Sequence, residues 1–464
     1  MKILKPLIPC LLVAALMSGC AHFATYPVNE PLKQGEIKVS RPLGSGSPGN
    51  SEKILLILSF SGGGTRAAAM AYGVLEELRD REVVIDGKKR RLLDEVDVIS
   101  GVSGGSFTAA YFGLFGERIF EDFESRFLKK NIQGGITNSV LFNPINWVRL
   151  ASPFFDRSDL AAEYYDENIF EGKTFGDMLN RRGPSIAINA TDMSTGTRVS
   201  FIPRGFNLIC SDLSKYSVAR ACAASSAVPG ALTPITLKNY AGTCGFKPPE
   251  EIERALRERK GNIRQRMLAE EVQTFMDSGK KPYIHLLDGG LADNLGLRTA
   301  IDQVLLLGNV WETLKINKME DVRKIVFLVV NAEKDVDTKW DQYSFLPPLT
   351  AMLSSYTTIA IQRYNVETVA LLQAHFKEWT REVQLKRCPP NQISTEPGAC
   401  GDMDFYLAEV KFSDLEKDDE KAYFMRLPTS FRLQPEEVDK LRAVSRRLLS
   451  QSEDFQRLLR DLEK

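Results

Sequence analysis

A predicted strand that ends at Gly-x-Ser-x-Gly and continues as a helix is the feature that most constrains this chain. The apolar run over residues 96–100 leads into Gly101-Val102-Ser103-Gly104-Gly105, and helix-forming residues follow from Ser106. A strand that passes directly into a helix is typical of α/β folds, in which strands and helices occupy adjacent layers. The sequence therefore predicts an α/β protein with a sharp strand-to-helix turn at Ser103.

The same turn predicts a nucleophilic serine. Glycines on both sides of Ser103 permit a strained turn that lifts the hydroxyl clear of the backbone. The positive N-terminal end of the following helix favours the negative charge that develops during acyl transfer. The pentapeptide alone also fits an ordinary strand–helix turn, so other parts of the sequence have to decide between the two interpretations.

The overall composition is that of an ordinary globular protein. Hydrophobic residues make up 43% and charged residues 26% of the 464 residues, which excludes a disordered or fibrous chain. Lys plus Arg and Asp plus Glu both number 60, so the formal net charge is zero. This balance produces no global field that would attract nucleic acid, and we expect no nucleic-acid partner.

The first twenty residues resemble a bacterial lipoprotein signal. Two lysines precede an apolar stretch over residues 7–17, and Ser18-Gly19-Cys20 follows it. The stretch is too short to span a bilayer. The resemblance implies removal of residues 1–19 and lipidation of Cys20, although Met17 stands where leucine is more usual. A plain secretory signal that is cleaved nearby is the alternative.

An exported protein, anchored to a membrane surface by an N-terminal lipid, follows from this interpretation. Ala21, in place of aspartate after Cys20, favours the periplasmic face of an outer membrane, by resemblance to known sorting signals. Residues 20–53 are rich in proline and contain a Gly-Ser-Gly-Ser run at 44–47. We expect this segment to be a flexible tether between the anchor and the folded domain.

Five cysteines lie downstream of Cys20. An exported chain meets an oxidising compartment, where cysteines pair. Cys388 and Cys400 bound a loop rich in proline, asparagine and glycine, so we predict a disulfide between them. Among Cys210, Cys222 and Cys244 the sequence does not allow a pair to be chosen. No Cys-x-x-Cys pattern suggests zinc, and we expect no metal.

A glycine-rich loop joins the first predicted strand to the first predicted helix. Residues 54–60 form a continuous apolar run, which indicates a strand buried on both faces, and Gly62-Gly63-Gly64 follow it. Three adjacent glycines present unhindered N–H groups at a helix start, as an oxyanion hole requires. A dinucleotide-binding loop fits less well, because the second strand ends in the Ser103 turn rather than in an acidic residue.

A serine nucleophile needs a base, and the chain has only three histidines. His22 lies in the predicted tether, and His375, which a triad in hydrolase order would require, lies in a predicted helix. Asp288 instead ends a predicted strand and precedes two glycines, so its carboxylate can emerge at the sheet edge where Ser103 emerges. We predict that Asp288 is the direct base. His285, three residues earlier on that strand, should point to the opposite face.

An aromatic-rich stretch over residues 120–170 has two interpretations. Within it, residues 140–150 either cap an apolar acyl-chain site or lie against lipid, or they form a helix packed on the core. The core helix is the slightly favoured interpretation.

Three motifs stand in one order along the chain, namely Gly62-Gly63-Gly64-Thr65-Arg66, Gly101-x-Ser103-x-Gly105 and Asp288-Gly289-Gly290. Together they resemble the patatin-like phospholipases, a family of lipid acyl hydrolases that use a Ser–Asp dyad. The resemblance implies Ser103 as nucleophile, Asp288 as base, the Gly62, Gly63 and Gly64 amides as oxyanion hole, and Arg66 as a supporting basic residue. Ala67 takes the last glycine position of the family's loop, a change to another small residue.

This resemblance also implies the architecture, a three-layer α/β/α fold with a mostly parallel central sheet. A signal peptide would occupy residues 1–19 and the tether residues 20–53. The catalytic domain would cover residues 54–300. Residues 301–464 would form a C-terminal part of strands and terminal helices that packs on the same domain.

The expected activity is phospholipase A-type hydrolysis of carboxylic esters through an acyl-serine intermediate, without a cofactor. The expected partner is a membrane phospholipid or another acyl-ester lipid. Two alternatives stay open. One is a carboxylesterase or thioesterase that acts on smaller acyl substrates, and the other is a lipid-binding or assembly protein without turnover.

Overall fold

The computed structural model describes residues 29–38, 50–258, 261–336, 338–389, 391, 400 and 403–463. The predicted signal peptide, residues 1–19, and the predicted lipidation site Cys20 lie outside the described residues. Within the described part of the chain, no helix combines the length and the apolar character that a membrane crossing needs.

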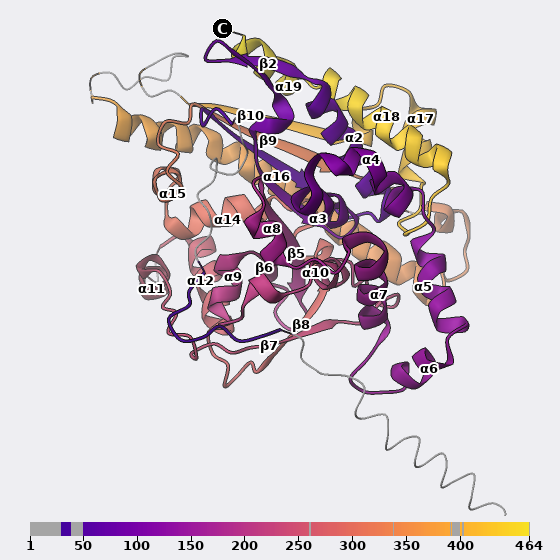
Figure 1. Ribbon diagram of the computed structural model, residues 1–464. Coiled ribbons are helices and arrows are strands. Elements are labelled where there is room, and N and C mark those ends of the chain that lie inside the picture. Colours follow the sequence, from indigo (N-terminus) through magenta and orange to yellow (C-terminus); the bar gives the residue numbers. More distant parts are fainter. Residues whose placement is uncertain are drawn as a thin grey trace, which may run out of the picture.

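One eight-stranded sheet forms the centre of the described structure (Figure 1). Its order is β10 (Asp404–Lys411), β9 (Lys324–Asn331), β1 (Ile54–Phe60), β4 (Val96–Val102), β5 (Ser185–Asp192), β8 (Tyr283–Asp288) and β7 (Ile235–Lys238), with β6 (Arg198–Phe201) paired to β5. The first five strands run parallel, and β8, β7 and β6 pair antiparallel. The prediction of an α/β fold with a mostly parallel sheet is confirmed.

Helices cover both faces of this sheet because the central strands are apolar on both sides. On β1, Leu56 and Leu58 belong to one core cluster, and Leu55 and Ile57 belong to another. The first cluster includes residues of α2 (Thr65–Asp80), α3 (Gly104–Phe115) and α18 (Pro435–Gln451). The second includes residues of α14 (Arg298–Leu307), α15 (Val310–Ile316) and α16 (Leu349–Arg387). The continuous apolar run of β1 thus produces the expected three layers.

The C-terminal part of the chain contributes to this same core. Strands β9 and β10 extend the sheet beyond β1, and α18 lies along α2, where Arg442 forms an ion pair with Glu76 at 2.7 Å.

The remaining α-helices of the described structure, and a separate two-stranded sheet of β2 and β3, surround this core. They are β2 (Glu82–Ile85), β3 (Lys88–Arg91), α4 (Ile119–Phe123), α5 (Ile132–Leu141), α6 (Pro144–Leu150), α7 (Arg157–Tyr165), α8 (Phe175–Asn180), α9 (Pro203–Leu208), α10 (Val218–Ser225), α11 (Glu250–Arg257), α12 (Ile263–Phe275), α13 (Gly290–Asp293), α17 (Asp418–Met425) and α19 (Glu453–Leu462).

Two disulfides are present in the described structure, and one of them was predicted. Cys388 and Cys400 form the predicted disulfide. Among the three cysteines that the sequence left undecided, Cys210 pairs with Cys244, and Cys222 is a buried thiol beneath the Ser103 turn. Sequence could not choose this pair because the partners are brought together by the fold across 34 residues.

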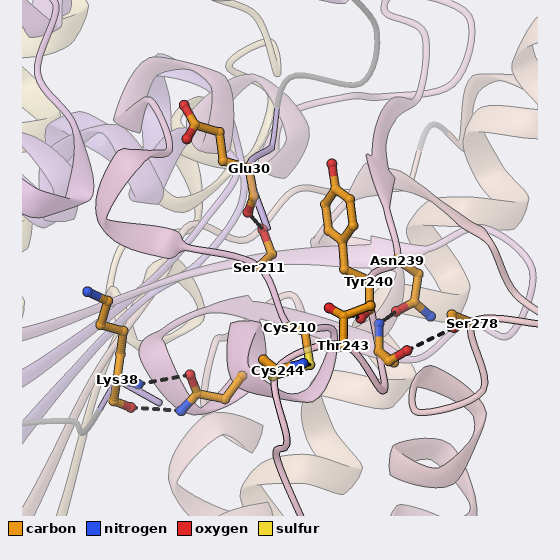
Figure 2. The surroundings of a disulfide bond; sticks show 11 residues. Glu30, Lys38, Cys210, Ser211, Asn239, Tyr240, Thr243, Cys244 and Ser278 are labelled. Atoms are coloured by element: carbon orange, nitrogen blue, oxygen red, sulfur yellow. Dashed lines mark hydrogen bonds between the residues drawn. A yellow bond between two sulfur atoms is a disulfide. The ribbon is translucent and has the colours of Figure 1, made fainter. Parts of the chain in front are cut away.

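Residues 29–38 pack over the Cys210–Cys244 disulfide (Figure 2). The backbone of Leu32 donates to the Cys210 carbonyl at 2.8 Å, and Lys38 exchanges two hydrogen bonds with the side chain of Asn207. Leu32 itself is buried against the disulfide. This packing corrects the prediction of a flexible tether for residues 29–38, while residues 20–28 and 39–49 lie outside the described part.

Residues 140–150 do not form the predicted core helix. They comprise the end of α5, the two linking residues 142–143 and the whole of α6, and several of their large apolar side chains are exposed. In Figure 1, α6 stands apart from the sheet and from the helices that cover it. The slightly favoured interpretation was wrong because composition does not show which face of a helix meets the core.

Candidate active site

Ser103 occupies a strained turn between β4 and α3. Its backbone has φ 49° and ψ −122°, a conformation that residues other than glycine rarely adopt. Gly104 follows it because any side chain there would collide with the carbonyl oxygen of Gly64. The sharp strand-to-helix turn predicted from the pentapeptide is present.

The backbone of the turn is held by a residue that the sequence analysis did not single out. The Ser103 N–H donates to the Ser225 hydroxyl at 2.8 Å. That hydroxyl donates in turn to the carbonyl of Asn189 on β5 at 2.6 Å. Ser225, at the end of α10, therefore ties the Ser103 turn to the neighbouring strand. A serine in a run of small residues carries no signal of this role in the sequence.

Asp288 lies beside Ser103, as predicted. Both side chains are nearly enclosed, with exposed fractions of 5% for Ser103 and 8% for Asp288. The Asp288 carboxylate accepts the Gly290 N–H at 2.8 Å. Burial raises the pKa of Asp288 to about 6, and hydrogen bonds from the Gly290 N–H and the Ser103 hydroxyl partly offset that rise. The carboxylate is therefore placed to accept a proton from the serine.

The glycine loop lies directly over this pair, but its three amides are not equivalent. The Gly62 N–H donates to the Asn294 carbonyl at 3.0 Å, so Gly62 does not fit the predicted role of oxyanion donor. A Cβ at Gly62 would approach the side chains of Asn294 and Ser103 to 2.6 and 3.3 Å, so only glycine fits there. Within the described part of the chain, the N–H groups of Gly63 and Gly64 donate no hydrogen bond.

Arg66 links the glycine loop to neighbouring segments of the chain. The side chain is buried, and its guanidinium donates to the carbonyls of Leu427 and Ala332 and to the Thr429 hydroxyl. Burial lowers the pKa of Arg66 to about 10, so it stays charged at neutral pH. Nearby, the Ser430 carbonyl accepts the Thr65 N–H at 2.9 Å. The segment 427–430 thus clamps the loop, a role that its sequence does not signal.

Replacing Arg66 by methionine should disturb both the loop and the fold. The change leaves two buried carbonyls without their charged donor, so we expect the free energy of unfolding to fall by about 2–4 kcal/mol. Turnover should fall more than apparent substrate affinity, because the loop's donors act on the transition state. Urea unfolding and steady-state kinetics measure the two effects. Arg79→Met on the same helix is the control, since its ion pair with Asp80 is partly exposed and should contribute under about 1 kcal/mol. Equal behaviour of both variants would contradict the clamp.

The two histidines in the described part of the chain, His285 and His375, lie away from this pair. His285 projects from the face of β8 opposite to Asp288, as predicted, and its ring is hydrogen-bonded to Thr236 at 2.8 Å. His375 lies on α16, where it contacts Glu378 at 3.0 Å and stacks on Trp379. Among the described residues, no cluster of three or more His, Cys, Asp or Glu side chains could hold a metal.

A family model described as "Patatin-like phospholipase" matches residues 58–301, which is more than half of the chain. The chain belongs to this family. The matched region of this patatin-like chain contains the glycine loop, the Ser103 turn and Asp288. It ends in α14, before strands β9 and β10.

Solved structures show more distant likeness to this patatin-like chain. Human GIVD cytosolic phospholipase A2 is 11% identical, with 89% of this chain and 62% of that chain covered and a TM-score of 0.44. The same human enzyme in complex with methyl gamma-linolenyl fluorophosphonate is 11% identical, with coverage of 89% and 59% and a TM-score of 0.41. VipD from Legionella pneumophila is 12% identical, with coverage of 92% and 73% and a TM-score of 0.25. The chain spans about three fifths of the length of the human enzyme chains. No curated protein sequence matches it.

Proposed function

We propose that this protein is a lipid acyl hydrolase that cleaves carboxylic esters of membrane lipids with a Ser103–Asp288 dyad. The observation that carries the proposal is the Ser103 hydroxyl, raised on a strained turn beside the buried carboxylate of Asp288, whose pKa it lowers. Family membership supports lipid acyl hydrolysis in general. Products released from mixed phospholipid vesicles, identified by mass spectrometry for the wild type and Ser103→Ala, test the proposal and define the ester that is cleaved.

The acylation step uses these two side chains and the loop. The Ser103 oxygen attacks the ester carbonyl carbon while its proton passes to the Asp288 carboxylate. The carbonyl oxygen becomes an oxyanion, which the N–H groups of Gly63 and Gly64 and the N-terminus of α3 would stabilise. The C–O bond to the alcohol then breaks, and Asp288 returns the proton to the departing alkoxide. An acyl-serine and a free alcohol result.

Deacylation reverses these roles with water in place of the alcohol. Asp288 takes a proton from a water molecule while the water oxygen attacks the acyl carbon. Asp288 then returns this proton to the Ser103 oxygen as the C–O bond between serine and the acyl group breaks. The products are a free fatty acid and the original enzyme. One acid–base group is enough for both steps, because Asp288 accepts a proton in the first half of each step and donates it in the second half.

The rate of hydrolysis should depend on pH through this carboxyl group. Asp288 must be ionised to accept a proton, and its pKa is about 6. We therefore expect kcat/KM to rise with pH through about 6 and to level off above it, with roughly a tenfold loss at about pH 5. A soluble nitrophenyl ester provides the measurement, and circular dichroism at each pH verifies the fold. A profile that is flat from about pH 5 to 8 would contradict Asp288 as base.

We also propose that the protein is exported and held on a membrane by lipid chains on Cys20. The motif Ser18-Gly19-Cys20 carries this proposal. The two disulfides support it, because disulfides persist in oxidising compartments. The periplasmic face of an outer membrane is the proposed location, on the basis of Ala21.

Cys20→Ser should release the protein from the membrane fraction or block its processing. Two or more acyl chains are needed for stable anchoring, and loss of the acylated thiol removes them. Fractionation of the cells and mass spectrometry of the N-terminal peptide measure the outcome. Cys222→Ser, which changes another unpaired cysteine, is the matched control and should leave fractionation unaltered. An unmodified N-terminus at a residue other than 20 would contradict the anchor.

A further inference from the structure

The α5–α6 hairpin, defined here as residues 131–155, presents large apolar side chains to water. Phe142 is 80% exposed, Ile145 is 68% exposed and Trp147 is 57% exposed. Leu141, Val148 and Phe154 are exposed as well. Single exposed apolar residues are common on proteins, but six within fourteen positions form a continuous feature that needs a partner.

The polarity of this hairpin is inverted. This inversion holds for residues 133–154, where the buried side chains are polar, namely Asn146, at 5% exposed, and Ser152. The buried apolar residues of the hairpin, Ile132 and Phe155, stand at its two ends, where it joins the rest of the protein. A helix that packs on a protein core in water has the opposite arrangement, with apolar side chains inside and polar ones outside. The hairpin therefore resembles an element whose outer surface meets an apolar medium.

Several polar groups of the hairpin are paired inside it. The Asn146 amide donates to the Ser139 carbonyl at 2.9 Å, and the Trp147 indole donates to the Val140 carbonyl at 2.6 Å. The Asn143 side chain caps α6 by accepting the Ile145 N–H. Such internal pairing lowers the cost of placing the hairpin in an apolar medium, where water would no longer be available as a partner.

The hairpin also lacks charge over most of its length. Residues 131–148 contain no Asp, Glu, Lys, Arg or His, although Lys130 and Arg149 stand on either side. Charged residues make up 26% of the whole chain. A protruding segment of this length without charge can contact hydrocarbon without the desolvation of an ion.

We propose that the α5–α6 hairpin docks on the surface of a lipid bilayer, with Phe142, Ile145 and Trp147 inserted at the boundary between headgroups and acyl chains. A bilayer fits better than a protein partner, because the internally paired polar groups offer few directional hydrogen bonds to an interface. Phe142 and Trp147 are side chains that such boundaries favour.

Docking there would bring the catalytic loop to the lipid. The Gln133 N–H at the base of the hairpin donates to the Phe431 carbonyl at 3.3 Å. Phe431 directly follows Ser430, whose carbonyl holds the Thr65 N–H beside the glycine loop. The hairpin would thereby help the enzyme to reach ester substrate in the bilayer, a role that rests on the proposed function.

The first test compares two substrates for each variant of the full chain. One is a vesicle of equal parts phosphatidylethanolamine and phosphatidylglycerol, and the other is a soluble short-chain nitrophenyl ester. Phe142→Glu with Ile145→Glu should lower the ratio of vesicle to soluble-ester hydrolysis by about tenfold or more, since each loses favourable apolar contact with lipid. The double variant Ile263→Glu with Ile316→Glu is the matched control and should keep the ratio, because these residues are also exposed, at 74% and 58%, but lie on α12 and α15.

The second test reports insertion without turnover. In the Ser103→Ala background, vesicles that contain bromine-labelled phospholipid should quench the fluorescence of Trp147. Trp147→Phe should remove that quenching, whereas Trp311→Phe should retain it. This readout does not depend on whether the N-terminus is lipidated, because an anchor alone does not place Trp147 in the bilayer.

The outcomes separate docking from catalysis. A lowered vesicle ratio together with quenching of Trp147 supports docking. Hydrolysis of the soluble ester without Trp147 quenching overturns docking and leaves the proposed function standing. Quenching of Trp147 with neither ester hydrolysed supports docking and overturns the proposed function. Absence of quenching combined with self-association that Phe142→Glu abolishes would assign the hairpin to a second copy of the chain and overturn the inference.

Discussion

Ser103→Ala should lower ester hydrolysis by about a thousandfold or more while the protein stays folded. The substitution removes the atom that forms the acyl intermediate, so the loss is several kcal/mol of transition-state stabilisation. The backbone hydrogen bond from Ser103 to Ser225 is retained, because it uses the main-chain N–H. Alanine also keeps the Cβ that lies against Gly62. Steady-state kinetics on a nitrophenyl ester and a thermal melt measure the two expectations.

The matched control is Ser106→Ala in the same turn. Its hydroxyl is buried and donates to the Ser103 carbonyl at 2.5 Å, so its loss perturbs packing without removing a nucleophile. A fluorophosphonate probe should label the wild type and Ser106→Ala but not Ser103→Ala. If Ser103→Ala keeps activity within about tenfold of the wild type, the assignment of the nucleophile is wrong.

Asp288→Asn should cost nearly as much activity as Ser103→Ala. The amide preserves the shape of the carboxylate but does not accept the serine proton. The free energy of unfolding of this variant should stay equal or increase at neutral pH, because the pKa of Asp288 is raised in the folded state. Burial raises the pKa of Asp288 to about 6, so ionising this carboxyl group destabilises the folded state relative to the unfolded chain, and that cost is complete once the pH is above about 6. Asparagine removes that buried charge. A thermal melt at about pH 8, read beside the kinetics, measures both effects.

The histidine variants distinguish a dyad from a triad. His285→Ala and His375→Ala should keep substantial activity, because His285 leaves the opposite face of β8 and His375 pairs with Glu378 on α16. In a triad one of the two would be as damaging as Ser103→Ala. Activity of either variant at the Ser103→Ala level, with circular dichroism unaltered, would show that Asp288 is not the direct base.

Much of the site's framework could be predicted from the sequence because its determinants are local. The strand that ends in Gly101-Val102-Ser103-Gly104-Gly105 allows few conformations, and the strained φ of Ser103 agrees with that prediction. The alternation of a strand placed His285 opposite Asp288 without knowledge of any neighbour. The unbroken apolar run of β1 likewise indicated helices on both faces.

The tertiary structure alone decided which backbone groups are occupied and which distant segments meet. The Gly62 N–H is taken by the Asn294 carbonyl, and Arg66 faces segment 427–430 rather than the Ser103 pair. Each of these contacts joins residues more than 200 positions apart, and no periodicity or propensity encodes such partners. The orientation of the α5–α6 hairpin was likewise decided by the tertiary structure. Its composition slightly favours a core helix over a lipid-facing one, yet the packing of the rest of the chain leaves Phe142 and Trp147 outside. Local patterns determined the turns and strands, because short-range sterics and side-chain periodicity depend on neighbours in sequence. Long-range contacts depended on the assembled fold.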